Sequence, residues 1–377
     1  MDLYEIESLC SGCGACAAVC ARKAITMIKD KKGFWIPYID KSRCCECGIC
    51  KKICPIQNRE SGVFLKQKEC YAMLSKDEIL RQNSRSGAIF IEIAKWIVER
   101  KGIVYGAAFD KDLNVTHMRA ETFDECKRFQ GSKYVQSVTY DIYPLVEKDL
   151  KEGKTVLFSG TGCQVDGLLR FLRVRSTPEN NLYTCDLVCH ANVSPGLYED
   201  YRKWYEKKYR GKMDSFDFRD KSLGWSAHSE SFYINNHKYI KRGYSEIYYS
   251  NAAYRASCYD CPYARRERVA DVTLADCWGG EKLSDIFDNK GISLVIINSD
   301  KAQTVLNEIQ DRLILREISL DEFLQPQLSH PIEKSERYQE FWNMYLTQGF
   351  AKVLSVFGKQ NLYSRIKRWA RVNIFKR

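Results

Sequence analysis

The clearest pattern of hydrophobic and polar positions lies near the start of the chain, between two cysteine-rich segments. Residues 25–40, ITMIKDKKGFWIPYID, predict a β-hairpin with short strands over 26–28 and 34–36 and a polar turn between them. Residues 59–68 are polar and typical of a linker. The first 58 residues are therefore expected to form a small module of their own.

After the linker, short apolar runs alternate with segments of helical periodicity. The segment 88–100 is apolar on most of its surface, which indicates a buried helix, and residues 213–250 alternate in β fashion. Further strands are predicted at 71–74, 102–110, 114–120, 155–159, 182–190, 271–280 and 291–299, and further helices at 140–151, 195–209, from 300 onward and at 335–347. This order predicts an α+β or α/β fold, with a larger mixed α/β domain after the small module.

Length and composition fit a soluble globular protein. The 377 residues leave room for one or two large cores, and the 45% hydrophobic and 28% charged residues are ordinary. The N-terminus shows no signal pattern, and no apolar run has the length of a membrane span. Seventeen cysteines in such a chain favour thiolate metal ligands in a reducing compartment, so we expect a cytoplasmic protein.

The formal charge of +11 at first suggests a nucleic-acid partner. Oxidised cubane clusters with four thiolates carry about −2 each, which removes much of this excess. Much of the rest lies after Glu340, where eight Lys or Arg residues follow and no acid. We therefore expect no nucleic-acid partner.

Two cysteine runs carry the strongest chemical signal. Residues 10–21 read CSGCGACAAVCA and residues 44–55 read CCECGICKKICP, so the gaps of two, two and three repeat. This spacing is typical of a ferredoxin with two [4Fe–4S] clusters, in which the fourth cysteine of each run serves the other cluster. One predicted cluster is held by Cys10, Cys13, Cys16 and Cys54, and the other by Cys44, Cys47, Cys50 and Cys20. Neither a zinc ribbon nor a disulfide framework uses two runs of four.

Four further cysteines are scattered in sequence but share a setting. Cys163 is expected on a glycine loop after the strand 155–159, and Cys189 follows another short strand. Loops at one sheet edge converge, and Cys258 and Cys261 form a CxxC pair that can chelate. A shared metal or cluster site is one interpretation. The other is a set of ordinary buried thiols, which are common.

The polar loop 81–87 ends at the predicted helix over 88–100. Its free N–H groups, beside Ser84, Ser86 and Gly87, suit a phosphate. An ordinary capped helix explains the same residues equally well.

Several motifs together resemble the coenzyme F420 hydrogenase/dehydrogenase beta-subunit family. SGTGCQVDGLL resembles its "GTPCQ" segment, DLVCHANVSP its "CHGxxSP" segment and NSRSGA its "SxSGG" segment. SCYDCPYA and DVTLADCWG resemble its CxxC and "DxTxGDxWG" segments, and the order is the family's own. The resemblance covers residues 1 to about 330. It divides the chain into a two-cluster ferredoxin domain (1–58), beta-subunit-like N-terminal (67–152) and C-terminal (153–330) regions, and a helical basic tail (331–377).

The resemblance implies an iron–sulfur flavoprotein with FAD beside a third [4Fe–4S] cluster. That cluster would be bound by Cys163, Cys189, Cys258 and Cys261. His190 is a candidate proton donor, and a structural hydrogen bond is the more common role of such a residue. The segments assigned to the flavin contain Ser84, Ser86, Gly87, Lys133, Gly160, Thr161 and Gln164.

The leading functional hypothesis is an oxidoreductase that exchanges electrons with a ferredoxin or other redox protein. Its FAD would reduce or oxidise an unidentified small molecule, F420-like or other. The alternatives are an electron-transfer subunit that serves a catalytic partner chain, and a structural metal-binding or nucleic-acid adaptor. The tail over 361–375 can form a basic amphipathic helix. It would either contact an anionic membrane surface or acidic redox partner, or dock on its own protein.

Overall fold

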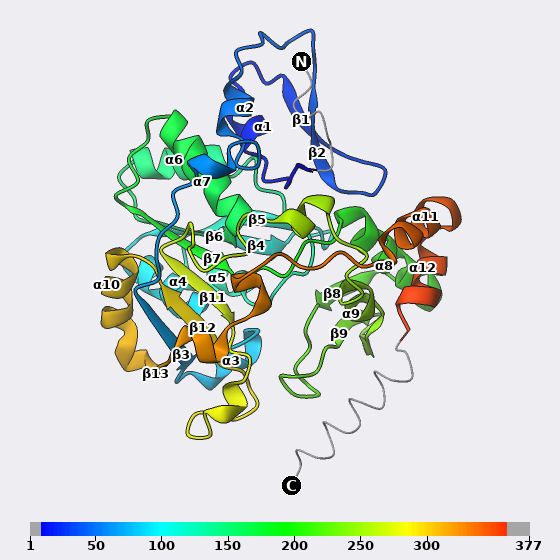
Figure 1. Cartoon of the computed structure of the whole chain (residues 1–377). Coiled ribbons are helices and arrows are strands. Elements are labelled where there is room, and N and C mark those ends of the chain that lie inside the picture. The colour runs from blue at the N-terminus through cyan, green and yellow to red at the C-terminus, as the bar shows by residue number, and fades with distance from the viewer. Residues whose placement is uncertain (1–8, 360–377) are drawn as a thin grey trace.

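The computed structural model describes residues 9–359 (Figure 1). The amphipathic segment predicted at 361–375 lies outside these residues. Among the described residues, no helix is long and apolar enough to cross a membrane. The small N-terminal module lies at one end of the molecule, above the larger mixed α/β domain (Figure 1).

The N-terminal module contains the predicted hairpin and two short helices. Strands β1 (Ile25–Lys29) and β2 (Trp35–Ile39) pair antiparallel, which confirms the hairpin. Helices α1 (Ala15–Val19) and α2 (Ile49–Ile53) each begin after a glycine in the left-handed region, with φ of 77° at Gly14 and 72° at Gly48. The repeated cysteine spacing therefore folds into a repeated loop-and-helix geometry.

One mixed sheet of eight strands forms the centre of the larger domain, in the order β13-β3-β12-β11-β7-β6-β4-β5. Neighbouring pairs among β4, β6, β7 and β11 are parallel, and β3 runs in the same direction, whereas β5, β12 and β13 run the opposite way. The sheet takes strands from both sides of residue 153, so the segments 67–152 and 153–330, which were expected as two regions, build a single layer. The strands are β3 (Glu69–Ser75), β4 (Ile103–Phe109), β5 (Val115–Ala120), β6 (Val156–Thr161), β7 (Leu182–Leu187), β11 (Val272–Asp276), β12 (Ser293–Ile297) and β13 (Leu313–Glu317).

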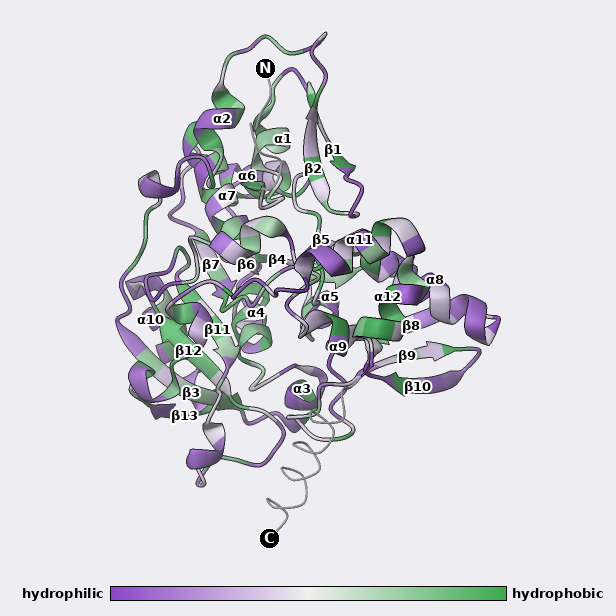
Figure 2. Cartoon of the chain, turned by 45° about the vertical axis from the view of Figure 1, so that its right-hand side comes forward, coloured by the Kyte–Doolittle hydropathy of each residue, from purple (hydrophilic) through white to green (hydrophobic). Residues whose placement is uncertain are grey.

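Alternate residues of the central strands pack into two different cores. On β6, Leu157 joins the core below helices α4 (Ile89–Glu99) and α10 (Asp300–Ile309). Val156 and Phe158 join the opposite core, below α6 (Tyr143–Lys151) and α7 (Gly162–Val174). Because both faces are covered, β11 and β12 are hydrophobic along most of their length, as Figure 2 shows.

A further, aromatic core lies beside the sheet. Its three-stranded sheet has the order β10-β9-β8 and packs against four helices. The elements are β8 (Met213–Asp217), β9 (Glu230–Ile234), β10 (His237–Lys241), α8 (Pro195–Tyr209), α9 (Gly243–Tyr248), α11 (Tyr338–Gln348) and α12 (Phe350–Phe357). The hairpin turn of the N-terminal module contacts α8 closely, since a Cβ on Gly33 would lie 2.6 Å from Gly196 Cα.

The structure also differs from the sequence-based expectations. Helices α3 (Glu78–Asn83), α5 (Phe123–Cys126) and α12 were not predicted, because all are short, and the edge strand β13 was not predicted either. The β assignment of 213–250 is wrong over Gly243–Tyr248, which forms helix α9. The expected glycine loop at 160–163 is wrong, since β6 continues to Thr161 and α7 begins at Gly162. The Gln164 side chain accepts the Thr161 N–H at 3.0 Å, so a capping interaction joins strand to helix without a loop.

Candidate functional site

The eight cysteines of the N-terminal module form two groups in space. Beyond the effect of burial, the Cys54 thiol lies close enough to those of Cys13 and Cys16 to raise their pKa, and the Cys20 thiol does the same to Cys50. Cys16 also lies near Cys50, so the two groups adjoin each other. Burial, followed by the nearby Cys54 thiol, raises the pKa of the Cys13 thiol. Cys20 and Cys54 each cap the C-terminus of a short helix, and that helix carries each of them away from its own loop. The exchange of the fourth ligands between the two clusters stays a prediction, which the proximity of Cys54 to Cys13 and of Cys20 to Cys50 supports.

The two groups differ in exposure. We call Cys10, Cys13, Cys16 and Cys54 the inner set, because all four are buried. We call Cys20, Cys44, Cys47 and Cys50 the outer set, because all are partly or fully exposed. The inner set faces the larger domain, and a Cβ on Gly167 of α7 would lie 3.2 Å from Cys13 Sγ.

Side chains of the larger domain bind the backbone of the inner loop. Arg255 Nη1 donates to Cys10 O at 2.9 Å, and Ser257 Oγ donates to the same oxygen at 3.0 Å. Thr139 Oγ1 and Tyr143 Oη donate to Cys13 O at 2.7 and 2.9 Å. Because these donors come from two separate segments, 139–143 and 255–257, they fix the inner set on the α7 side of the sheet.

The four scattered cysteines lie together next to the inner set. Burial raises the pKa of the Cys189 thiol, and the thiols of Cys258, Cys163 and Cys261 raise it further. Cys163 is in the first turn of α7, not on a loop, and its electrostatic neighbours include Cys13. We call these four residues the third set.

Two parallel strands and the CxxC segment bring the third set together. Cys163 follows β6 and Cys189 follows β7, so both lie at the carboxyl edge of the sheet, as the sequence predicts. Cys258 and Cys261 lie in or just after a short 3-10 helix over Ala256–Asp260. Among residues 9–359, no three His, Cys, Asp or Glu side chains are arranged to hold a single metal ion. A cubane needs its four sulfurs further apart than a single ion does.

A fully buried ion pair holds the CxxC segment against the sheet. Arg268 Nη2 donates to Asp186 Oδ2 at 2.7 Å, and neither side chain is more than 2% exposed. Arg268 Nη1 also donates to Tyr263 O at 2.6 Å. Asp186 lies on β7, so this pair connects the segment after Cys261 to the strand that precedes Cys189.

The residues assigned to the flavin fall into two groups at the same sheet edge. Thr161 and Gln164 lie at the β6–α7 junction, and Gln164 Nε2 donates to Ser137 Oγ at 2.9 Å. Ser84 lies before α4 and accepts from Gln130 Nε2 at 2.8 Å. The segment 130–137 therefore joins the two groups.

The start of α4 is more closed than the sequence suggests. The Gly87 N–H donates to Ser293 Oγ at 2.9 Å, and Ser86 Oγ donates to Ile292 O at 2.6 Å. A Cβ on Gly87 would lie 2.1 Å from Met73 O, so close packing alone requires glycine there. Lys133 Nζ donates to three backbone carbonyls, those of 128–130.

A polar and aromatic site between the aromatic core and the eight-stranded sheet was not predicted from the sequence. Arg85 pairs with Asp276 at 2.8 Å, and Arg219 Nη1 donates to the hydroxyls of Tyr249 and Tyr134 at 2.7 and 3.2 Å. We call these five residues the Arg219 site. They come from five segments without a common spacing, so the sequence carries no signal that joins them.

His190 lies beside the Arg219 site. Its ring is 5.9 Å from that of Tyr249 and 5.6 Å from that of Tyr248. Burial lowers the pKa of His190, which favours the neutral imidazole. Its Nε2 makes no hydrogen bond of normal geometry among the described residues, although the Asn251 and Gln327 side chains lie near enough to the ring to offset part of the pKa shift. Trp225 Nε1, next to Arg85, is buried without a partner among the same residues.

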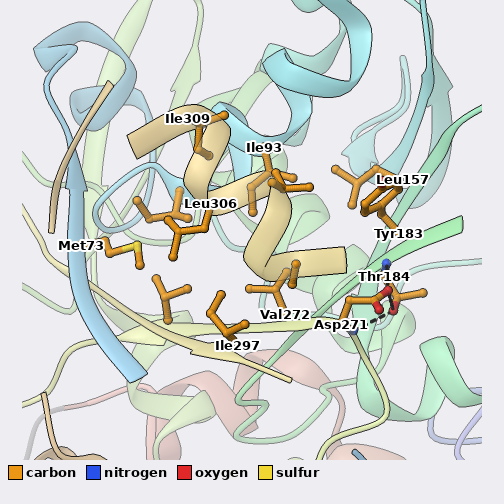
Figure 3. A pocket seen from close by; sticks show the side chains of 14 residues that line it. Met73, Ile93, Leu157, Tyr183, Thr184, Asp271, Val272, Ile297, Leu306 and Ile309 are labelled. Atoms are coloured by element: carbon orange, nitrogen blue, oxygen red, sulfur yellow. Dashed lines mark hydrogen bonds between the residues drawn. The ribbon is translucent and has the colours of Figure 1, made fainter. Parts of the chain in front are cut away.

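A small apolar cavity elsewhere does not have the features of a reactive site. It lies between the sheet and helices α4 and α10, with Met73, Ile93 and Leu306 in its lining (Figure 3). Its polar residues are Thr184 and Asp271, which bind each other at 2.8 Å. The cavity is on the face of the sheet opposite α7, so we interpret it as a packing gap in the core.

The fold and these sites define an iron–sulfur protein in which a ferredoxin-type module is docked on a mixed α/β domain. Residues 9–58 match the 4Fe-4S dicluster domain. Residues 153–322 match the family described as the C terminus of the coenzyme F420 hydrogenase/dehydrogenase beta subunit. Residues 153–322 are therefore similar to this beta-subunit family, and a 4Fe–4S dicluster module precedes them in the chain.

Two curated relatives from Methanocaldococcus jannaschii match short stretches. An iron-sulfur subunit of the CoB–CoM heterodisulfide reductase is 34% identical over 64 residues, or 14% of this chain and 10% of the relative. An uncharacterized polyferredoxin-like protein is 41% identical over 63 residues, or 14% of this chain and 35% of the relative. This chain thus spans a tenth and about a third of the lengths of these relatives.

Among solved structures, the chain is similar to one from the F420-reducing [NiFe] hydrogenase complex of Methanosarcina barkeri. The two are 16% identical, with a TM-score of 0.48. The match covers 77% of this chain and 91% of the other.

Proposed function

We propose that this chain is an iron–sulfur flavoprotein oxidoreductase that passes electrons between ferredoxin-type clusters and non-covalent FAD. The observation that carries the proposal is the position of the third set. On one side the third set lies next to the buried inner set. On the other side it adjoins the Arg219 site, because His190 directly follows Cys189 and its ring lies 5.9 Å from that of Tyr249. A third [4Fe–4S] cluster on Cys163, Cys189, Cys258 and Cys261 would fit this position.

The residues around the Arg219 site fit a bound flavin. Arg219 and Arg85 supply positive charge for phosphates or for an anionic ring, and the tyrosine rings supply flat apolar surfaces. Buried polar atoms without partners, such as His190 Nε2 and Trp225 Nε1, would gain hydrogen bonds from a polar ligand. A flavin there would supply the link between one-electron carriers and two-electron substrate chemistry.

The substrate class stays broad in this proposal. The family matched by residues 153–322 is described by its coenzyme F420 enzymes, so an F420-like deazaflavin is one substrate to test. His190 would position the substrate through a hydrogen bond at Nε2, and its neutral imidazole could accept a proton there; the role of proton donor would require the imidazolium form, which burial disfavours. We further propose that the protein acts in the cytoplasm, because the exposed cysteine ligands of the outer set need a reducing compartment to stay unoxidised.

A second candidate function is an electron-transfer subunit that serves a catalytic partner chain. The match to a family of beta subunits favours it, since a subunit works within a complex. The two functions differ in whether this chain binds a flavin of its own.

Anaerobic purification with iron, sulfide and flavin counted per chain tests the proposal. We expect about twelve irons, four per cluster, and one FAD released on denaturation. Cys258→Ser should lower the count to about eight irons, whereas Cys126→Ser, a buried thiol in the other core, should leave it unchanged. A count near eight in both wild type and Cys258→Ser contradicts the third cluster. Absence of flavin after reconstitution favours the subunit function.

A further inference from the structure

The exposed end of the N-terminal module is strongly basic around the outer set. Between Cys20 and Cys54 the sequence has nine Lys or Arg residues and three Asp or Glu residues. Six of the basic residues directly flank the outer cysteines, and all are exposed or half-buried. We call them the outer-cluster face: Arg22, Lys23, Lys41, Arg43, Lys51 and Lys52.

The fold brings the separate parts of this face together. Arg43 Nη2 donates to Arg22 O at 3.2 Å, which joins the segment after Cys20 to the segment before Cys44. Lys51 and Lys52 lie on α2, and Asn58 Nδ2 donates to the carbonyls of both. Exposed or half-buried basic residues therefore flank the outer cysteines on each of these segments, and Glu46 is the one acid between Cys44 and Cys50.

One exposed apolar side chain lies among the outer cluster ligands. Ile49 is 39% exposed and lies between Cys47, which is exposed, and Cys50. An apolar centre with a charged rim is the usual anatomy of a protein interface. The inner set, by contrast, is buried against the larger domain, so a partner reaches only the outer set.

From these observations we infer that the outer-cluster face is the docking surface for a small acidic electron-carrier protein with an iron–sulfur cluster. Complementary charge would steer the carrier to the exposed outer set and raise the rate of encounter. In each encounter the reduced carrier loses one electron and a cluster of the module gains it. The inference rests on the proposed function for the direction of electron flow, but the docking itself does not depend on a flavin.

Stopped-flow reduction of the full-length holoprotein tests the inference, with a reduced acidic plant-type [2Fe–2S] ferredoxin as the probe. The test variant combines Lys41→Glu, Arg43→Glu and Lys52→Glu, none of which is a cluster ligand. The control variant combines Lys111→Glu, Lys207→Glu and Lys352→Glu, three exposed residues of the larger domain, so its net charge changes equally. The readout is the rate at which the module clusters become reduced, followed by rapid-freeze electron paramagnetic resonance.

We expect the test variant to be reduced at least about tenfold more slowly than wild type at low ionic strength. The control variant should stay within about twofold of wild type, and the difference should shrink at high salt. Equal spin counts after full reduction by dithionite would show that the clusters are intact in all three proteins.

Equal reduction rates for the test variant and wild type at low salt would overturn the inference. An equal loss in both variants would also overturn it, because net charge alone would then explain the effect. If the test variant loses retention on duplex DNA but not reduction by the ferredoxin, the face binds nucleic acid and the inference is wrong. Failure of the proposed function would appear as missing flavin, which does not enter this readout.

Discussion

Arg255 is the side chain whose loss should most directly separate the N-terminal module from the larger domain. It is 4% exposed, and its guanidinium donates to Cys10 O at 2.9 Å, Trp35 O at 2.8 Å and Gln136 Oε1 at 2.7 Å. The guanidinium also lies 4.6 Å from the centre of the Phe34 ring. Arg255→Met would remove these three bonds and leave the oxygens buried.

The size of the effect follows from the contacts. A hydrogen bond to a charged group contributes about 1.5–3 kcal/mol, and neighbouring bonds are not additive. The substitution leaves neutral oxygens, and Cys10 O and Gln136 Oε1 each keep a second donor, so we expect a total loss of about 3 kcal/mol. Because about 1.4 kcal/mol corresponds to tenfold, opening of the inner loop should become at least about a hundredfold more frequent.

Anaerobic release of iron to a chelator measures this opening. We expect Arg255→Met to release iron from the inner set at least about a hundredfold faster than wild type. Arg255→Lys should be intermediate, because a lysine retains the charge but cannot make all three bonds at once. The matched control is Arg265→Met, since Arg265 is 47% exposed, and its surface pair with Glu267 is worth less than about 1 kcal/mol. An Arg255→Met rate within about threefold of wild type would refute this reasoning.

Two further predictions concern the cysteine exchange and the buried ion pair. Cys20→Ala should damage the outer cluster, and Cys54→Ala the inner one. Paramagnetic resonance of each reconstituted variant checks this, and loss of the cluster of Cys10, Cys13 and Cys16 in Cys20→Ala would contradict the assignment. Asp186→Asn should lower the free energy of unfolding by about 3–5 kcal/mol, because Arg268 would stay buried without its carboxylate. The control is Asp285→Asn, because the ion pair of Asp285 with Arg316 is exposed; in urea unfolding its free energy of unfolding should fall by less than about 1 kcal/mol. Equal losses of unfolding free energy in the two variants would contradict the prediction.

The sequence predicts most of the sheet, because its buried strands are short apolar runs bounded by turns. The residues of β12 and the helix α10 that follows it were both expected from this pattern. Strand β13 was not, since at the sheet edge four of its five residues are exposed and it carries little hydrophobic signal. The β6–α7 junction was misjudged because glycines at 160 and 162 suggested a loop, whereas the side chain of Gln164 caps the helix directly.

The cysteine sets of the N-terminal module could be predicted from the sequence, whereas the Arg219 site could not. Ligands on one tight loop must keep a fixed spacing, so the repeated spacing of the N-terminal cysteines predicts both groups before any fold is known. The residues of the Arg219 site come from five segments, and only the packing of the aromatic core against the sheet brings Arg219 near Asp276. Such a site has no sequence period, and a three-dimensional structure is needed to find it.

The three cysteine sets follow one another from the exposed end of the N-terminal module into the larger domain. The outer set is exposed, the inner set is buried against α7, and the third set begins at the first turn of the same helix. Helix α7 thus contacts the module through Gly167 and carries Cys163 at its start, so one rigid element fixes the distance between the inner and third sets. Movement of the N-terminal module would change that distance, and the hydrogen bonds from Arg255, Thr139 and Tyr143 to the inner loop oppose such movement. The buried Asp186–Arg268 pair fixes the CxxC segment to the same sheet.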